Sequence, residues 1–364
     1  MPWRVGLDEA GYGPNLGPLV LSSSACRVPA DAPPSLWECL AAAVRKAEHP
    51  DDGRLLIDDS KKVNEGKAGL AKLEAGVLAA VGLHLRGGGE APDLTPPGPS
   101  SPISRGGAET TRPPISEAEG GGWGGEVRGF AAPPTVSAYL SSVALGESLP
   151  DLHSEPWFQP ADPLPAAHPA DELSAVAAAL AGACGPTGLA WGPVRSVVIP
   201  TPKFNRLLDE WKNKSGVLAS GVIALLQATL ELPGDEPIHI TVDKLGGRHF
   251  YAPLLNEAFP GGWVRVIREG PDLCEYAIDH LPREVHLRFE PRADGCHLNV
   301  ALASMAAKYL REVCMLQFNR YWTAKVPGLK PTAGYPTDAG RFFADIRKTL
   351  KAEGIDKRAV WRAK

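Results

Sequence analysis

Residues 3–26 read WRVGLDEAGYGPNLGPLVLSSSAC, and this segment predicts how the chain begins to fold. Two short apolar runs, 3–8 and 19–26, flank a loop punctuated by glycines and prolines. Because glycine and proline mark turns with particular backbone angles, the pattern predicts two paired strands joined by a loop with a defined path. The first strand ends in two adjacent acids, Asp8 and Glu9, directly before the loop.

Short apolar strands and amphipathic helices alternate along the rest of the chain. The patterns predict strands at 194–200, 238–243, 263–268 and 284–290, and helices at 36–47, 67–85, 171–183, 202–211, 215–230, 295–321 and 338–353. Such alternation is typical of an α/β fold with a partly parallel, mixed central sheet flanked by helices.

The composition changes abruptly in the middle of the chain. Residues 86 to about 134 are rich in Gly, Pro, Ser and Thr without an apolar period, and 149–169 is rich in proline. Such segments bury too little surface to offset the entropy of ordering. We therefore expect residues 1–85 and 190–364 to form one catalytic domain, and 86–170 to be a disordered insertion, either an inert spacer or a tether for a partner.

The composition also limits the class of protein. The net charge of −4 over 364 residues does not indicate nucleic-acid binding, which favours basic surfaces. Residues 341–364 nevertheless form a more basic tail. That tail is either a solvated helix or a phosphate-contacting face. Six scattered cysteines indicate neither zinc nor disulfides. Without a targeting signal or an apolar run of ~20 residues, we expect a cytoplasmic monomer that has no membrane contact.

The acids at strand ends are the candidates for chemistry. Asp243 closes the predicted strand 238–243, as Asp8 closes the first one, and ligands of open α/β sheets bind at the carboxyl ends of strands. Magnesium prefers such oxygen ligands, and a pair of ions can cleave a phosphodiester. A strand-ending Asp is also a common turn former. Glu312, one helical turn after Lys308, is on spacing alone a surface ion pair.

The order of these motifs resembles ribonuclease HII. The family's opening segment is matched by DEAGYGP at 8–14, its DSKK signature by 59–62, and its VDG-like segment by Val242, Asp243 and Lys244. FNRLL and SGVIALLQATL match the helical region before that segment, ASMAAKYLRE at 303–312 matches a later helix, and GYPT at 334–337 closes the series. Ribonuclease HIII is similar but carries an extra N-terminal domain, and this chain begins at the catalytic strand.

The resemblance implies a ribonuclease H-like fold and a metal-dependent endonuclease that cuts the RNA strand of RNA–DNA hybrids or embedded ribonucleotides in duplex DNA. It implies that two Mg²⁺ or Mn²⁺ ions bind to a tetrad, with the loop 11–13 reading the 2′-hydroxyl through its backbone. The implied tetrad is Asp8, Glu9, Asp243 and Glu312, and the implied substrate contacts are Gly11, Tyr12, Gly13, Lys61, Lys62 and Tyr335.

Three positions depart from the family pattern. Tyr12 replaces an arginine, Glu312 replaces an aspartate, and Lys244 replaces a glycine and adds a charge beside the third acid. The first change removes a bidentate phosphate donor, and the second moves a carboxylate by about a bond length. Two other functions therefore stay open: a nuclease of the same fold with another nucleic-acid substrate, and a nucleic-acid-binding module with impaired catalysis.

Overall fold

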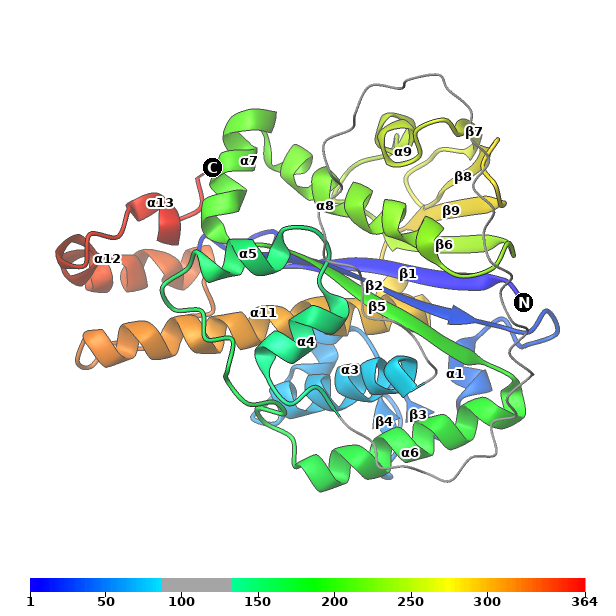
Figure 1. The fold of residues 1–364 in the computed structure, drawn as a ribbon, viewed down its shortest axis with the longest axis horizontal. Helices are drawn as coiled ribbons and strands as arrows, with labels where there is room; N and C mark the ends of the chain where they lie inside the picture. The colour runs from blue at the N-terminus through cyan, green and yellow to red at the C-terminus, as the bar shows by residue number, and fades with distance from the viewer. Residues whose placement is uncertain (87–131, 364) are drawn as a thin grey trace, which may run out of the picture.

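The computed structural model describes residues 1–86 and 132–363. Its centre is a seven-stranded mixed sheet with the order β5-β2-β1-β6-β9-β8-β7 (Figure 1). The central strands β1, β6 and β9 are parallel, and every other neighbouring pair is antiparallel. The strands are β1 (Trp3–Ala10), β2 (Leu19–Arg27), β5 (Ala190–Ile199), β6 (Ile238–Asp243), β7 (Trp263–Arg268), β8 (Cys274–Asp279) and β9 (Val285–Glu290), and a small parallel ladder joins β3 (Val44–Arg45) to β4 (Leu55–Leu56).

Helices pack on both faces of this sheet and form two separate cores. One core lies under α1 (Leu36–Cys39), α3 (Gly69–Arg86), α4 (Val136–Val143), α6 (Ala170–Thr187) and α11 (Leu298–Lys325). The other lies under α7 (Thr201–Trp211), α8 (Lys214–Ala228) and α9 (Ala252–Ala258). The remaining helices are α2 (Ser60–Val63), α5 (Ser148–His153), the 3₁₀ turn η1 (Thr229–Glu231), α10 (Ala293–Cys296), α12 (Pro336–Ala352) and α13 (Lys357–Val360).

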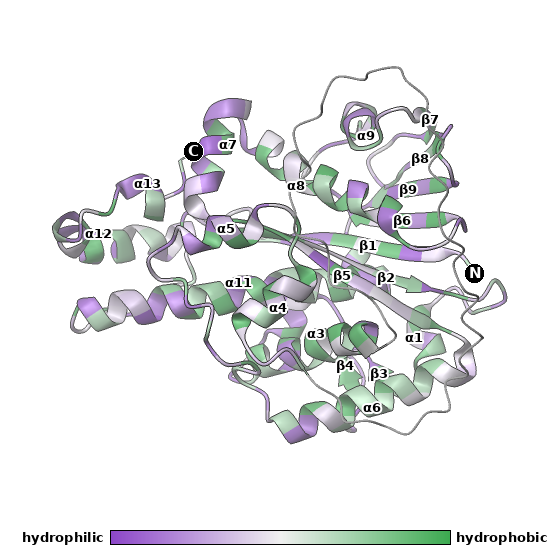
Figure 2. Ribbon diagram, viewed as in Figure 1, coloured by the Kyte–Doolittle hydropathy of each residue, from purple (hydrophilic) through white to green (hydrophobic). Residues whose placement is uncertain are grey.

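Alternation along the strands decides which side chains reach each face. On β6, Ile238, Ile240 and Val242 are buried in the core under α8, and the residues between them point to the opposite face. Figure 2 shows the same alternation of hydrophobic and hydrophilic residues along β6 and β9. Because successive side chains of a strand point to opposite faces, Asp8 and Asp243 share the face that α11 partly covers.

Gly6 lets β1 and the long helix α11 approach closely. A Cβ atom at this position would lie 2.2 Å from the backbone carbon of Asn299, so any other residue would push the helix away. Eight residues of β1 therefore run along α11, and Ser304 of α11 comes beside Asp8. The closeness of this contact positions the carboxyl end of β1.

The predicted α/β architecture, a mixed sheet flanked by helices, is confirmed. Two local predictions are wrong. The helix expected over 36–47 ends at Cys39, and the antiparallel strand β8 was not expected. Among the described residues, no helix is long and apolar enough to cross a membrane.

The prediction of a disordered insertion over 86–170 is wrong for residues 132–170. They form α4 and α5, and the side chains of Tyr139, Leu140 and Leu152 are buried in the core beside α3. These helices are short and follow proline-rich stretches, so their apolar periods are too brief to stand out in the sequence. Residues 87–131 of the predicted insertion lie outside the described part of the chain.

Candidate active site

Four carboxylates from three separate segments meet at the carboxyl end of the parallel strands. Leu7 of β1 is paired with Val242 of β6, so the next residues, Asp8 and Asp243, are neighbours. Glu9 follows Asp8 and donates its amide to that carboxylate at 2.7 Å. Asp294 arrives on α10, just after β9, where the amide of Ala293 donates to Asp243 at 2.8 Å. We call Asp8, Glu9, Asp243 and Asp294 the acidic cluster.

Burial raises the pKa of all four acids, and repulsion between like charges adds to the shift at Asp8, Glu9 and Asp294. For Asp8 the shift is well above the usual range, caused by burial and then by the charges of Glu9 and Asp243. Burial and Asp243 raise the pKa of Glu9 to about 7. Burial, then Asp59 and Asp243, raise the pKa of Asp294 to about 6. Such crowding of like charges is common where a cation or a proton is handled.

Asp243 is held more firmly than the other members of the cluster. Burial raises the pKa of its carboxyl, while the backbone amides of Ala293, Lys244 and Arg292 partly offset that shift. Hydrogen bonds to the charged form favour ionisation, which explains the opposing effect. Asp243 therefore ties β6 to the α10 turn that carries Asp294.

The short helix α2 brings one lysine to this cluster and turns the next one away. Asp59 caps α2 by accepting from the amide of Lys61 at 2.8 Å, and the hydroxyl of Ser304 on α11 donates to that of Ser60 at 3.0 Å. The charge of Lys61 lowers the pKa of Glu9 and so partly offsets the cluster's repulsion. Lys62 instead lies 3.4 Å from the buried Asp58.

Glu312, the predicted fourth ligand, lies elsewhere. It sits eight positions beyond Ser304, which is about 12 Å along the axis of α11. Its carboxylate forms ion pairs with Lys308 at 2.6 Å and with Arg311 at 3.7 Å. The acid that the structure brings beside Asp243 is Asp294. Asp294 lies four positions beyond Glu290, the last residue of β9, so the rule that selects strand-ending acids selects Glu290 on this strand and not Asp294.

The glycine-rich loop at residues 11–17 adjoins the cluster with an exposed and a buried part. Residues 14–17 are buried, whereas Gly11, Tyr12 and Gly13 keep solvent access. Gly11 has φ of 89° and lies against Arg311, a combination that requires glycine. Among the described residues, the amides of 11–13 have no hydrogen-bond partner. These three amides are therefore available to a ligand.

Tyr335, one of the expected substrate contacts, follows a residue that binds the same loop. Its neighbour Gly334 accepts from the amides of Asn15 and Leu16 at 2.8 and 3.2 Å. The ring of Tyr335 is 44% exposed and lies 5.7 Å from the guanidinium of Arg311, so an aromatic face stays open to solvent.

The structure shows where the side chains of two departures from the family pattern, Tyr12 and Lys244, lie. Tyr12 packs on the core under α8, and burial and then the charge of Glu9 raise its pKa. Lys244 was expected to add a charge beside the third acid, but its ammonium turns away and donates to the carbonyls of Gly270 and Pro271, both at 2.6 Å. Its charge is therefore taken up by a distant turn.

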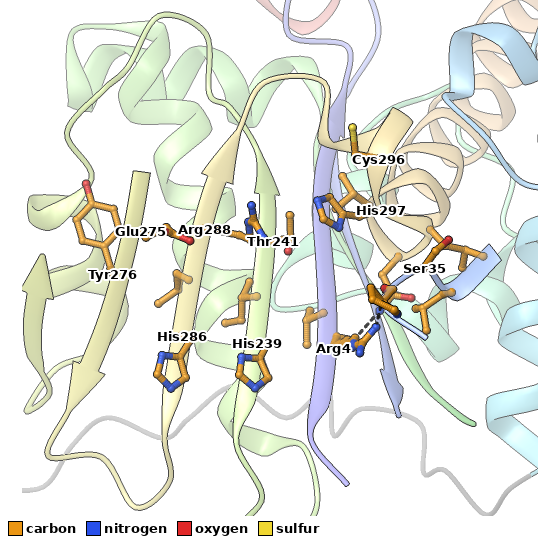
Figure 3. A pocket seen from close by; sticks show the side chains of 18 of the residues that line it. Arg4, Ser35, His239, Thr241, Glu275, Tyr276, His286, Arg288, Cys296 and His297 are labelled. Atoms are coloured by element: carbon orange, nitrogen blue, oxygen red, sulfur yellow. Dashed lines mark hydrogen bonds between the residues drawn. The ribbon is translucent and has the colours of Figure 1, made fainter. Parts of the chain in front are cut away.

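A cavity of about 550 Å³ lies on the same face of the sheet but does not include the acidic cluster. Figure 3 shows His239 and His286 side by side on neighbouring strands, with Arg4 on the next strand. The two imidazole rings stack with centroids 5.2 Å apart. Burial, then His286 and Arg4, lower the pKa of His239. Arg4, His239, His286 and Arg288 line the cavity together with a single acid, Glu275, so its balance of charge differs from that of the cluster.

The donor set of the acidic cluster suits a hard divalent cation. All four groups offer carboxylate oxygens, which Mg²⁺ and Mn²⁺ prefer, and a bound cation would relieve the repulsion that helps to raise the pKa of Asp8, Glu9 and Asp294. Within residues 1–86 and 132–363, no group of three or more His, Cys, Asp or Glu side chains is arranged to hold a metal as it stands. Binding would therefore draw the carboxylates closer together.

No protein-family model and no curated protein sequence matches this chain. Solved structures similar to it include ribonuclease HII from Archaeoglobus fulgidus in complex with PCNA, with 12% identity and a TM-score of 0.37 over 99% of this chain and 94% of that one. Ribonuclease H2 from Pyrococcus horikoshii OT3 has 13% identity and a TM-score of 0.37, over 98% and 92%. Bst-RNase HIII in complex with Mn²⁺ has 13% identity and a TM-score of 0.37, over 99% and 66%. Similarity this low says nothing about the activity, which must be judged from the side chains.

Proposed function

We propose that this chain is a metal-dependent endonuclease that hydrolyses the RNA strand of RNA–DNA hybrids or ribonucleotides embedded in duplex DNA. The observation that carries the proposal is the meeting of Asp8, Glu9, Asp243 and Asp294 beside a loop with free backbone amides. A structural role does not explain why four acids from three segments are brought together at a cost in repulsion.

The acidic cluster would hold two Mg²⁺ or Mn²⁺ ions. When bound, such ions activate water and stabilise the leaving oxygen of a phosphodiester. Asp8 and Asp243, which end paired strands, would hold the ions together with Glu9 and Asp294. Lys61 offsets part of the remaining negative charge next to the substrate phosphate.

The loop 11–13 supports a ribonucleotide as the substrate. Its free amides can donate to a 2′-hydroxyl, the group that distinguishes RNA from DNA. The exposed ring of Tyr335 can pack on the adjoining sugar. Water would add its oxygen to phosphorus while the bond to the 3′ oxygen breaks, and one water proton would leave on the new 3′-hydroxyl. The other product carries a 5′-phosphate.

The test compares wild type with Asp8→Asn on a 5′-labelled RNA–DNA hybrid, with Mg²⁺ or Mn²⁺. We expect cleavage by wild type, none of the matched all-DNA duplex, and a loss of more than ~100-fold in the variant. Equal cleavage by both proteins would refute the assignment. Salt-dependent binding without any cleavage would favour the impaired binding module, and cleavage of the all-DNA duplex would favour a different substrate.

A further inference from the structure

One buried arginine near the C-terminus binds the inner side of the glycine-rich loop. Arg362 is fully buried, and its guanidinium donates to the carbonyls of Gly11, Pro14 and Gly17. The bond from Nε to Gly17 is 2.8 Å long. The backbone amide of Arg362 donates to the carbonyl of Asn15 at 2.9 Å. A single residue therefore satisfies four carbonyls of the loop.

The segment that carries Arg362 is itself fastened to α7. The buried amide side chain of Asn205 donates to the carbonyls of Arg358 and Trp361 at 2.8 and 2.9 Å, and it accepts from the amide of Ala363 at 2.7 Å. The guanidinium of Arg362 lies 4.7 Å from the ring centroid of Phe204 on the same helix. The arginine is thus held in place before any ligand arrives.

These contacts act on the side of the loop that faces away from solvent. With the carbonyls of residues 11, 14, 15 and 17 bound inward, the amides of Gly11, Tyr12 and Gly13 are left free on the accessible side. The guanidinium has five N–H groups in a rigid plane, and it donates from Nε and both terminal nitrogens to the carbonyls of residues 11, 14 and 17. Lysine carries the same charge without that geometry.

We infer that Arg362 is a positioning residue that fixes the backbone of the loop 11–17 so that its outward amides can receive the ribonucleotide. The inference rests on the proposed function for its consequence in catalysis. The contact between the C-terminal segment and the loop can be tested without any activity. Because Arg362 does not touch the acidic cluster in any hydrogen bond, its loss should leave cation binding intact.

The experiment uses the full chain and the variants Arg362→Gln and Arg362→Lys. We expect each variant to raise KM for the hybrid at least ~10-fold, a typical cost of losing a supporting hydrogen-bond partner, with unchanged affinity for Mn²⁺. Hydrogen–deuterium exchange of the amides of residues 15–17 should become faster. In a third variant, Arg362→Gly, free guanidinium at millimolar concentration should restore the slow exchange, whereas ammonium should not.

Arg358→Gln is the matched control, because this arginine lies in the same segment but contacts Asn205 and Asp209 rather than the loop. It should behave as wild type. Unchanged KM and unchanged exchange in Arg362→Gln would overturn the inference, and so would a parallel loss of Mn²⁺ affinity. If wild type cleaves no hybrid, the proposed function fails. Faster exchange that guanidinium reverses would still support the contact.

Discussion

The two ends of one sheet face have opposite chemistry. At the carboxyl end, Asp8 and Asp243 are neighbours, and burial raises the pKa of both. At the other end of the same strands Arg4 is paired with His239, which is paired with His286 on β9. There burial and the neighbouring His286 and Arg4 lower the pKa of His239. Lowering the pH therefore protonates carboxylates and relieves repulsion between negative charges at the first end. At the second end it adds positive charge to His239 beside Arg4 and so creates repulsion.

This difference shows that strand register, more than net charge, decides where a cation can bind. The two ends are separated by four residues, or roughly 13 Å of strand. Glu290 lies level with Asp243 but is not part of the acidic cluster, because it forms an ion pair with Arg288 at 2.8 Å and contacts the ring of His297. A net charge of −4 therefore conceals one acidic and one basic site on a single face.

The largest effect is expected from removing the carboxylate that the α10 turn contributes. Asp294→Asn should lower hybrid cleavage by more than ~100-fold, because a misplaced cation costs that much. Glu312→Gln is the matched control on α11 and should stay within about threefold, since its carboxylate pairs with Lys308. Steady-state cleavage assays measure both. A larger loss of cleavage in Glu312→Gln than in Asp294→Asn would contradict this prediction. It would support Glu312, and not Asp294, as the fourth acid of the site.

Cation affinity should rise with pH at the acidic end. Below a pKa of about 7 at Glu9 and about 6 at Asp294, a cation must displace protons, and above these values it need not. Affinity for Mn²⁺ should therefore increase by up to roughly tenfold per pH unit for each displaced proton below these pKa values, and should level off above them. Calorimetric titration of wild type measures the change. Affinity that is independent of pH would show that the cluster is not the binding site.

A smaller effect is expected on stability without metal. A carboxyl whose folded-state pKa is raised stabilises at low pH, and that contribution is lost as pH rises through the folded-state value. Asp8→Asn should thus raise Tm by roughly 2 °C at pH 8 in EDTA, with less gain at pH 5. Thermal unfolding measures both, with the exposed Asp209→Asn as control. A destabilised variant at pH 8 would argue against repulsion in the cluster.

The smallest effect is expected at the opposite end, with the opposite sign. A histidine whose pKa is lowered below 6.5 stabilises above that value, and this contribution is lost as pH falls. His239→Asn should therefore remove part of the acid sensitivity, by about 1 °C or less at pH 5, because His239 is only partly buried and solvent screens its charge. The control compares the Tm of wild type and His239→Asn at pH 8, where protonation of His239 no longer contributes to the difference. A variant that is more acid-sensitive than wild type would contradict the lowered pKa.

Much of the candidate site could be predicted from positions in the sequence. Asp8, Glu9 and Asp243 follow from apolar runs that end in acid, and the glycine-rich loop from its turn residues. Asp294 was not predicted, because the resemblance of the helix motif at 303–312 implies Glu312 as the fourth acid instead. Spacing along a helix places a residue on a face, but it does not say which turn lies beside a given strand end.

The sequence by itself determined the alternation of strands and helices and the acids at strand ends, because these depend on local periodicity. Only the tertiary structure decided which acids meet. The close approach at Gly6 sets Asp8 beside Ser304 rather than Glu312. It also decided that Arg362, some 350 positions from Gly11, binds the loop. Such contacts depend on packing between distant segments, which local patterns do not encode.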